Sequence, residues 1–327
     1  MSVDILRGLV IVIMGLDHVR DFFSPTLFAP EDPTVTTPAW FFTRWITHFC
    51  APVFVFLAGT SAYLYSLKVS KMELSRFLWS RGAWLILIEF TVVNFVWKFT
   101  YFDWWFVQVI ATIGIAMMLM GVLIHTPKWF LFAFAGITIL GHNLLDNIHI
   151  DAYWWQLLHE SRWVPPVFVV YPQIPWPGVM VFGYLAGHWF TQAAERRKRN
   201  LVWLGLAMSA GFIVLRFINV YGDPHAWSVM ERGSLYTFLD FLNTTKYPPS
   251  LLYLLMTLGP AVVVLAYAET WKGKIADFFL VFGRVPFFYY VMHLLVGHVL
   301  AILYNGLYYN EWRSWLFDNP ASWPTTL

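Results

Sequence analysis

The chain has 327 residues, of which 59% are hydrophobic and only 12% are charged, against roughly 25% charged residues in ordinary soluble domains. Its mean hydropathy is +0.58. A water-soluble fold of this length has too little interior to bury so much apolar surface, so the composition predicts an integral membrane protein. The net charge of +2 gives no reason to expect a nucleic-acid partner, and the single cysteine, Cys50, excludes an intrachain disulfide.

Apolar runs near the ~20 residues that a helix needs to cross a bilayer recur along the chain. We expect nine helical spans, at 3–23, 39–67, 74–97, 104–125, 128–145, 175–193, 201–219, 248–269 and 285–305. Residues 275–284 predict a short surface helix, and the mixed tail 306–327 is not expected to span. The expected fold class is all-α: a polytopic transmembrane bundle of nine to ten spans, forming one domain over 1–327.

Lysine and arginine are unevenly distributed between the connections. With the N-terminus inside, the inner loops hold Lys68, Lys71, Arg76, Lys128, the basic run 196–199, Lys272 and Lys274. The outer loops hold mainly Arg162, Arg232, Lys246 and Arg313. The positive-inside rule therefore predicts a cytoplasmic N-terminus, with the long connections 24–38, 146–174 and 220–247 on the outer side.

The first span carries ionisable residues at both ends. Arg7 and His18 are eleven residues apart, so on a helix they share a face and lie about 16 Å apart along the axis. Asp4 and Asp21 fall near that face, whereas Asp17 points about 100° away from His18. These residues also suit a plain membrane anchor, with the arginine reaching the headgroups. Because ionisable groups in a span cost several kcal/mol unless they face a cavity or a partner, we favour a functional face.

Other spans contribute further polar groups. They are Arg44, His48, Glu89, Asn94, His142, Asn143, Asp146, Arg216, His293 and His298. Five histidines of the set, counting His18, are expected in the outer halves of their helices and therefore to converge toward one leaflet. A metal site is the competing interpretation, but no histidine spacing within one helix supports it, and we predict none.

Four stretches resemble a known family. They are SVDILRGLVIVIMGLDH (2–18), THFCAPVFVFLAG (47–59), YPQIPWPGVMVFGYLAG (171–187) and FGRVPFFYYVMHL (282–294). They resemble bacterial membrane proteins of unknown function that are related to the catalytic domain of heparan-alpha-glucosaminide N-acetyltransferase, and the resemblance covers most of the chain. The spacing of Arg7 and His18 is also similar to a motif of the membrane acyltransferases that O-acetylate surface polysaccharides.

The resemblance implies a multi-pass acyltransferase of the bacterial cytoplasmic membrane. Such proteins move an acyl group, here expected to be acetyl, from cytosolic acyl-CoA to the oxygen or nitrogen of a sugar on the far side. The lysosomal members differ at two points. They carry asparagine where His18 stands, with their catalytic histidine in the next outer loop, and an acidic residue where His48 stands. The family usually ends with a further helix and a basic tail, which this sequence does not show, so the absence of a last helix is left open.

Residue roles follow from the chemistry of acyl transfer, which needs a base for the acceptor proton. Histidine suits that task because its pKa of about 6.5 is close to working pH. We assign catalysis to His18, His48, Asp17 and Asp21, and expect Asp21 or His48 to be the partner of His18. CoA phosphates are assigned to three inner-side arginines, Arg7, Arg81 and Arg284. The acceptor is assigned to His293, Arg44, His142, Asn143 and Asp146.

The partners expected are the lipid bilayer, acetyl-CoA or another acyl-CoA as co-substrate, and a glycan or amino-sugar acceptor, with a homodimer left open. A proton-coupled transporter or flippase is the alternative, because carriers also use Asp, His and Arg inside the membrane. We find no internally repeated halves of the kind that many transporters show. A scaffold that has kept the fold without the chemistry is a third interpretation.

Overall fold

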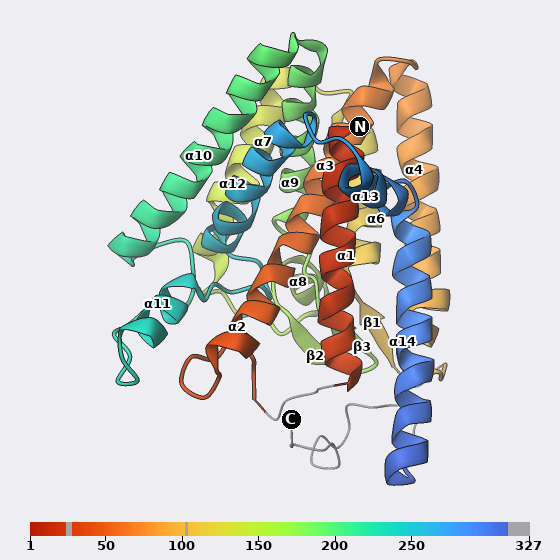
Figure 1. Ribbon diagram of the computed structural model, residues 1–327. Helices are drawn as coiled ribbons and strands as arrows, with labels where there is room; N and C mark the ends of the chain where they lie inside the picture. The colour runs from red at the N-terminus through yellow and green to blue at the C-terminus, as the bar shows by residue number, and fades with distance from the viewer. Residues whose placement is uncertain (24–27, 102–103, 313–327) are drawn as a thin grey trace.

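The computed structural model describes residues 1–23, 28–101 and 104–312. Long helices run roughly side by side through the molecule, and most of the short helices and a small sheet lie toward one end of them (Figure 1). That end also holds the end of α1 (Ser2–Phe23) that carries His18. The all-α class predicted from the composition is confirmed.

Each of the nine predicted spans contains a helix in the described ranges. These are α1, α2–η1–α3 (Pro38–Trp45, Ile46–Phe49, Cys50–Ser66), α4–η2–α5 (Lys71–Ile88, Glu89–Val93, Asn94–Lys98), α6 (Val109–Leu123), α7 (Lys128–Leu140), α9–η4 (Trp176–Gly187, His188–Thr191), α10 (Ala194–Ile218), α12 (Leu251–Ala268) and α14 (Pro286–Tyr309). Within those ranges, four helical segments are long and apolar enough to cross a membrane by length and composition: 38–66, 194–218, 251–268 and 286–309. The count of nine membrane crossings therefore stays a prediction.

Shorter elements connect these helices. They are η3 (His142–Leu145), α8 (Tyr153–Leu158), α11 (Ser234–Leu242) and α13 (Lys274–Arg284), with strands β1 (Trp105–Val107), β2 (Arg162–Val164) and β3 (Val167–Val169). The short helix predicted over 275–284 is confirmed as α13. Helix α10 begins at Ala194 instead of residue 201, because the basic run 196–199 consists mainly of good helix formers. Of the tail 306–327, the part from residue 313 on lies outside the described residues.

The helix predicted from residue 104 begins only at Val109. Residues 105–107 form β1 instead, which pairs in parallel with β3, while β2 pairs with β3 in antiparallel fashion. The amide of Asn94 holds β1 in place, since it donates to the carbonyl of Phe106 and accepts from the amide of the same residue. A short apolar run cannot be assigned to strand or helix from periodicity alone, so the sequence prediction was wrong here.

Two close helix crossings depend on glycine pairs. Where α3 crosses α9, a Cβ on Gly59 would lie 1.9 Å from the carbonyl oxygen of Met180. Where α1 crosses α13, a Cβ on Gly8 would lie 1.8 Å from the carbonyl oxygen of Phe279, and Gly283 faces it from the other helix. Small residues let helix backbones approach this closely inside membranes. Helix α1 also contacts α3, α12 and α14, so much of its surface faces protein.

Candidate functional site

A cavity of about 890 Å³ lies beside α1 inside the bundle. Its volume is within the range of small-molecule sites. Arg7, Ile11, Met14, His18 and Asp21 all line it, and the helix rises about 21 Å from the first of these to the last. One cavity therefore joins the two polar ends of the first helix, on the face that their spacing predicts.

The wall between the two ends is apolar. Phe54 and Ala58 of α3, Leu78 of α4, and Ile113 and Met117 of α6 contribute to it. The same wall holds Cys50, whose thiol donates to the carbonyl of a residue on α1. An apolar middle with polar ends suits an elongated ligand that has an apolar arm.

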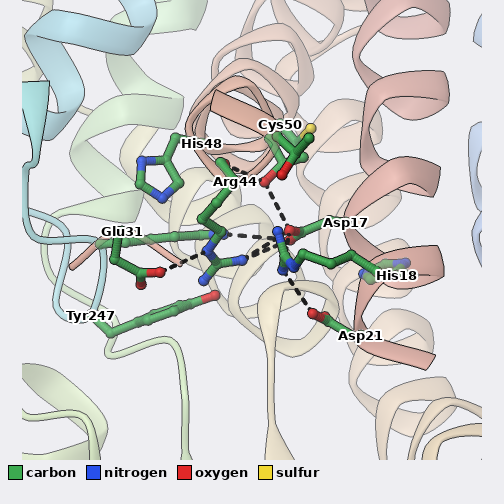
Figure 2. A network of polar contacts seen from close by, with 12 residues as sticks. Asp17, His18, Asp21, Glu31, Arg44, His48, Cys50 and Tyr247 are labelled. Atoms are coloured by element: carbon green, nitrogen blue, oxygen red, sulfur yellow. Dashed lines mark hydrogen bonds and ion pairs between the residues drawn. The ribbon is translucent and has the colours of Figure 1, made fainter. Parts of the chain in front are cut away.

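The carboxylate of Asp17 is the centre of a polar cluster near the C-terminal end of α1, here called the outer cluster after the predicted topology (Figure 2). Its oxygens accept from Arg44 Nη1 at 2.9 and 3.0 Å and from Thr47 Oγ1 at 2.9 Å. Arg20 Nη2 lies 2.7 Å from Asp17 Oδ1, and Lys246 Nζ lies 4.0 Å from Oδ2. Asp17 thus joins three cations from α1, α2 and the loop before α12.

Two further carboxylates stand at the rim of this cluster. Asp21 accepts a hydrogen bond of 2.7 Å from Arg20 Nη2, and Glu31 lies 3.7 Å from Arg44 Nε. Both line the cavity. The carboxylate of Asp21 is therefore occupied by Arg20 and does not orient His18.

The imidazole of His18 bonds instead to His293 of α14, with 2.6 Å between Nδ1 of the first ring and Nε2 of the second. His293 Nδ1 in turn lies 2.7 Å from the backbone oxygen of Tyr289. A carbonyl oxygen only accepts, so His293 Nδ1 carries the hydrogen, and Nε2 of a neutral ring must accept. His18 is then the Nδ1–H tautomer. Its Nε2 has no hydrogen-bond partner in the part of the chain that the structure describes, and the ring lies in the cavity wall, so His18 has the arrangement of an oriented base.

At the end of the cavity near the N-terminus of α1, Arg7 is held by three neighbouring groups. Nη1 donates to Asp4 at 3.0 Å and to the backbone oxygen of Gly283 at 3.2 Å, and Nη2 donates to Ser61 at 2.8 Å. The two other arginines assigned to CoA phosphates, Arg81 and Arg284, are exposed and do not line the cavity. The structure therefore does not bring the three arginines together.

His48 is buried on the far side of Arg44 from Asp17 in Figure 2. It does not line the cavity, and its ring nitrogens have no hydrogen-bond partner among the described residues. Its ring packs edge-on against Tyr253, whose hydroxyl donates to the backbone oxygen of His48. The structure therefore does not bring His48 to His18.

The three polar residues after α7 form a separate network. His142 Nε2 lies 2.7 Å from the backbone oxygen of Pro249, and Asn143 accepts from the amide of Leu251 at the start of α12. Asn143 donates to Asp146, which also contacts the imidazole of His159. None of the three lines the cavity. Their contacts fasten α7 to the beginning of α12.

The remaining polar residues of the predicted spans also have local partners. His298 is close to the backbone oxygen of Val96 and stacks on aromatic rings. Glu89 accepts from the amide of Ala111. Arg216 donates to four backbone oxygens around α11. The expected convergence of five histidines reduces to one contacting pair, His18 and His293.

Sequence reasoning missed Arg20, Thr47, Glu31 and Lys246 as site residues. Arg20 follows Asp17 by three positions and so shares its helix face, a signal that could have been used. The sequence gave no such signal for Lys246, because the position of its loop depends on Asp223, which is distant in the sequence. Asp223 accepts from the backbone and the hydroxyl of Thr245 and from Ser250, and so holds the loop that carries the lysine.

Within the described ranges, no three His, Cys, Asp or Glu side chains are arranged to hold a metal ion. The fold and the cavity together describe a helical membrane protein with a polar-ended internal chamber. The sequence profile of the catalytic domain of heparan-alpha-glucosaminide N-acetyltransferase matches residues 1–218. The chain belongs to this family of membrane acetyltransferases. A comparison with curated proteins finds no match. The matched range ends with α10, so Lys246 and His293 lie beyond it.

Proposed function

We propose that this protein transfers an acetyl group from cytosolic acetyl-CoA to the hydroxyl or amino group of a sugar on the outer side of a bacterial cytoplasmic membrane. The observation that carries the proposal is the single cavity between Arg7 and His18. The apolar length of that cavity suits a pantetheine arm. Its polar outer end suits a sugar, which carries many hydrogen-bonding groups.

Arg7 is the group that we assign to the CoA phosphates. A guanidinium has five N–H donors, and the three hydrogen bonds of Arg7 leave two of them free. A charge-assisted bond from these donors to a phosphate oxygen is stronger than a neutral one. The inner-side position agrees with nucleotide binding from the cytosol.

His18 is the group that we assign to general base catalysis. As the acceptor oxygen or nitrogen attacks the thioester carbon, a new C–O or C–N bond forms and the C–S bond breaks. His18 Nε2 takes the proton lost by the acceptor and returns it to the departing thiolate. His293 is a positioning residue in this step, because it accepts from Nδ1 of His18 and so fixes the tautomer.

The test is to incubate the purified protein with acetyl-CoA and a sugar acceptor, and to measure free thiol and acetylated sugar. We expect both products, and a fall of about 10²–10⁴-fold in the His18→Ala variant. His149→Ala is the matched control, since that histidine has a side chain 77% exposed in an outer connection and should retain full activity. Full transfer by His18→Ala would remove His18 from the mechanism. An intact thioester together with sugar transport would favour the carrier instead.

A further inference from the structure

Positive charge exceeds negative charge in the buried part of the outer cluster. The side chains of Arg20, Arg44 and Lys246 are 9%, 12% and 8% exposed. Asp17 is the carboxylate buried to the same extent, at 11%, whereas the two rim carboxylates are 30% and 34% exposed. Water screens the rim pairs, so three buried cations share one buried anion.

Two of these cations have binding capacity that the protein leaves unfilled. Arg20 Nη1 is buried without a partner among the described residues. Asp17 is the one carboxylate within 4.0 Å of Lys246 Nζ in the described ranges, at the limit of an ion pair. Arg44, by contrast, binds both oxygens of Asp17. The unfilled donors are therefore those of Arg20 and Lys246.

Burying a cation without a counter-charge is unfavourable, and a buried donor without an acceptor adds to that cost. A ligand with a carboxylate or phosphate would supply both the charge and the acceptor oxygens. A guanidinium beside an ammonium is a suitable donor set for such a group. We propose that the outer end of the cavity binds an anionic group, and that the group belongs to the acceptor sugar. This inference rests on the proposed function.

The position of the two cations agrees with a role in acceptor binding. Arg20, Lys246 and His18 line the same cavity, and Arg20 lies two residues after His18 on α1. An anion held there keeps the rest of a small sugar within reach of the imidazole. The phosphates of CoA are the other source of an anion, and the experiment must separate the two.

The experiment measures binding of matched sugars to the full-length protein in detergent by calorimetry. The pairs are glucose with glucuronate, and glucosamine with glucosamine 6-phosphate, which differ only in the anionic group. We expect the anionic member of at least one pair to bind at least about tenfold more tightly than its neutral partner. Lys246→Met and Arg20→Met should remove most of that preference. Arg162→Met, which removes an outer cation with a side chain 54% exposed, should keep it.

Equal binding of the neutral and anionic members in both pairs by the unmodified protein would overturn the inference, whatever the variants do. So would a Lys246→Met variant that weakens CoA binding about tenfold and leaves the sugar preference intact, because the site would then hold the CoA phosphates. Acetyl transfer is measured in parallel. A clear preference for the anionic sugar without any thioester turnover would support the anion site and overturn the acyltransferase proposal alone.

Discussion

Asp17→Asn should be among the most destabilising single changes in the outer cluster. The substitution keeps the size of the side chain and an oxygen that can accept from Thr47, but it removes the charge opposite Arg20, Arg44 and Lys246. Removing one partner of a buried ion pair costs about 3–5 kcal/mol, because the other partner stays buried and unpaired. We expect a loss of that size in the free energy of unfolding.

Asp21→Asn is the matched control, one turn further along the same helix. Within the described ranges its carboxylate has one ion pair, with Arg20, and is 30% exposed. Pairs of this kind contribute at most about 1 kcal/mol. The two variants should therefore differ by at least about 2 kcal/mol in stability.

Unfolding of both variants in one detergent, followed by circular dichroism against a denaturant, measures this difference. Adding Arg44→Met to Asp17→Asn removes one of the stranded cations and should recover part of the lost stability. If the two single variants unfold at the same denaturant concentration, or the double variant is no more stable than Asp17→Asn, the buried excess of positive charge is not what organises the cluster.

Three further outcomes are expected. His293→Leu should lower kcat for acetyl transfer by at least about tenfold and leave KM for acetyl-CoA unchanged, because His18 loses the partner that orients it. An equal change in kcat and KM would contradict the role of His293 as a positioning residue. Arg7→Met should weaken CoA binding by about tenfold or more in calorimetry, whereas Arg81→Met should not. Gly283→Ala should cost about 1–3 kcal/mol of stability, because the added Cβ would lie 1.8 Å from a carbonyl oxygen of α1. Gly136→Ala is the control and should cost nothing, because the space around that position is open.

Hydropathy located the helices of the nine predicted spans, but it did not locate α8 and α11, which lie in the predicted connections 146–174 and 220–247. A helix in lipid satisfies its own hydrogen bonds and needs an apolar run of definite length, and both properties are local in sequence. Strand β1 was missed because it depends on pairing with β3, about sixty residues further on. The sequence contains no local mark of that partner.

The candidate site was predictable along one helix and not between helices. The turn angle of an α-helix places Arg7 and His18 on one face, and both line the cavity. The contact between His18 and His293 joins α1 to α14 across 275 positions. Helical spacing rules relate residues within one helix, so they could not predict this contact. Lys246 comes to Asp17 through a loop that Asp223 shapes from a distance. Side-chain direction and loop geometry decided these contacts.

The apolar middle of the cavity bears on the ion permeability of the membrane. A chamber that extends along a helix predicted to cross the membrane would be a potential path for the leakage of protons and other ions. Among the described residues, the charged groups that line the cavity are Arg7 at one end and the outer cluster around Asp17 at the other. An ion that entered would have to shed its hydration shell between them, where the described residues supply no charged group to replace it. The apolar middle of the cavity, which suits a pantetheine arm, should therefore also prevent ions from crossing the bilayer through this protein.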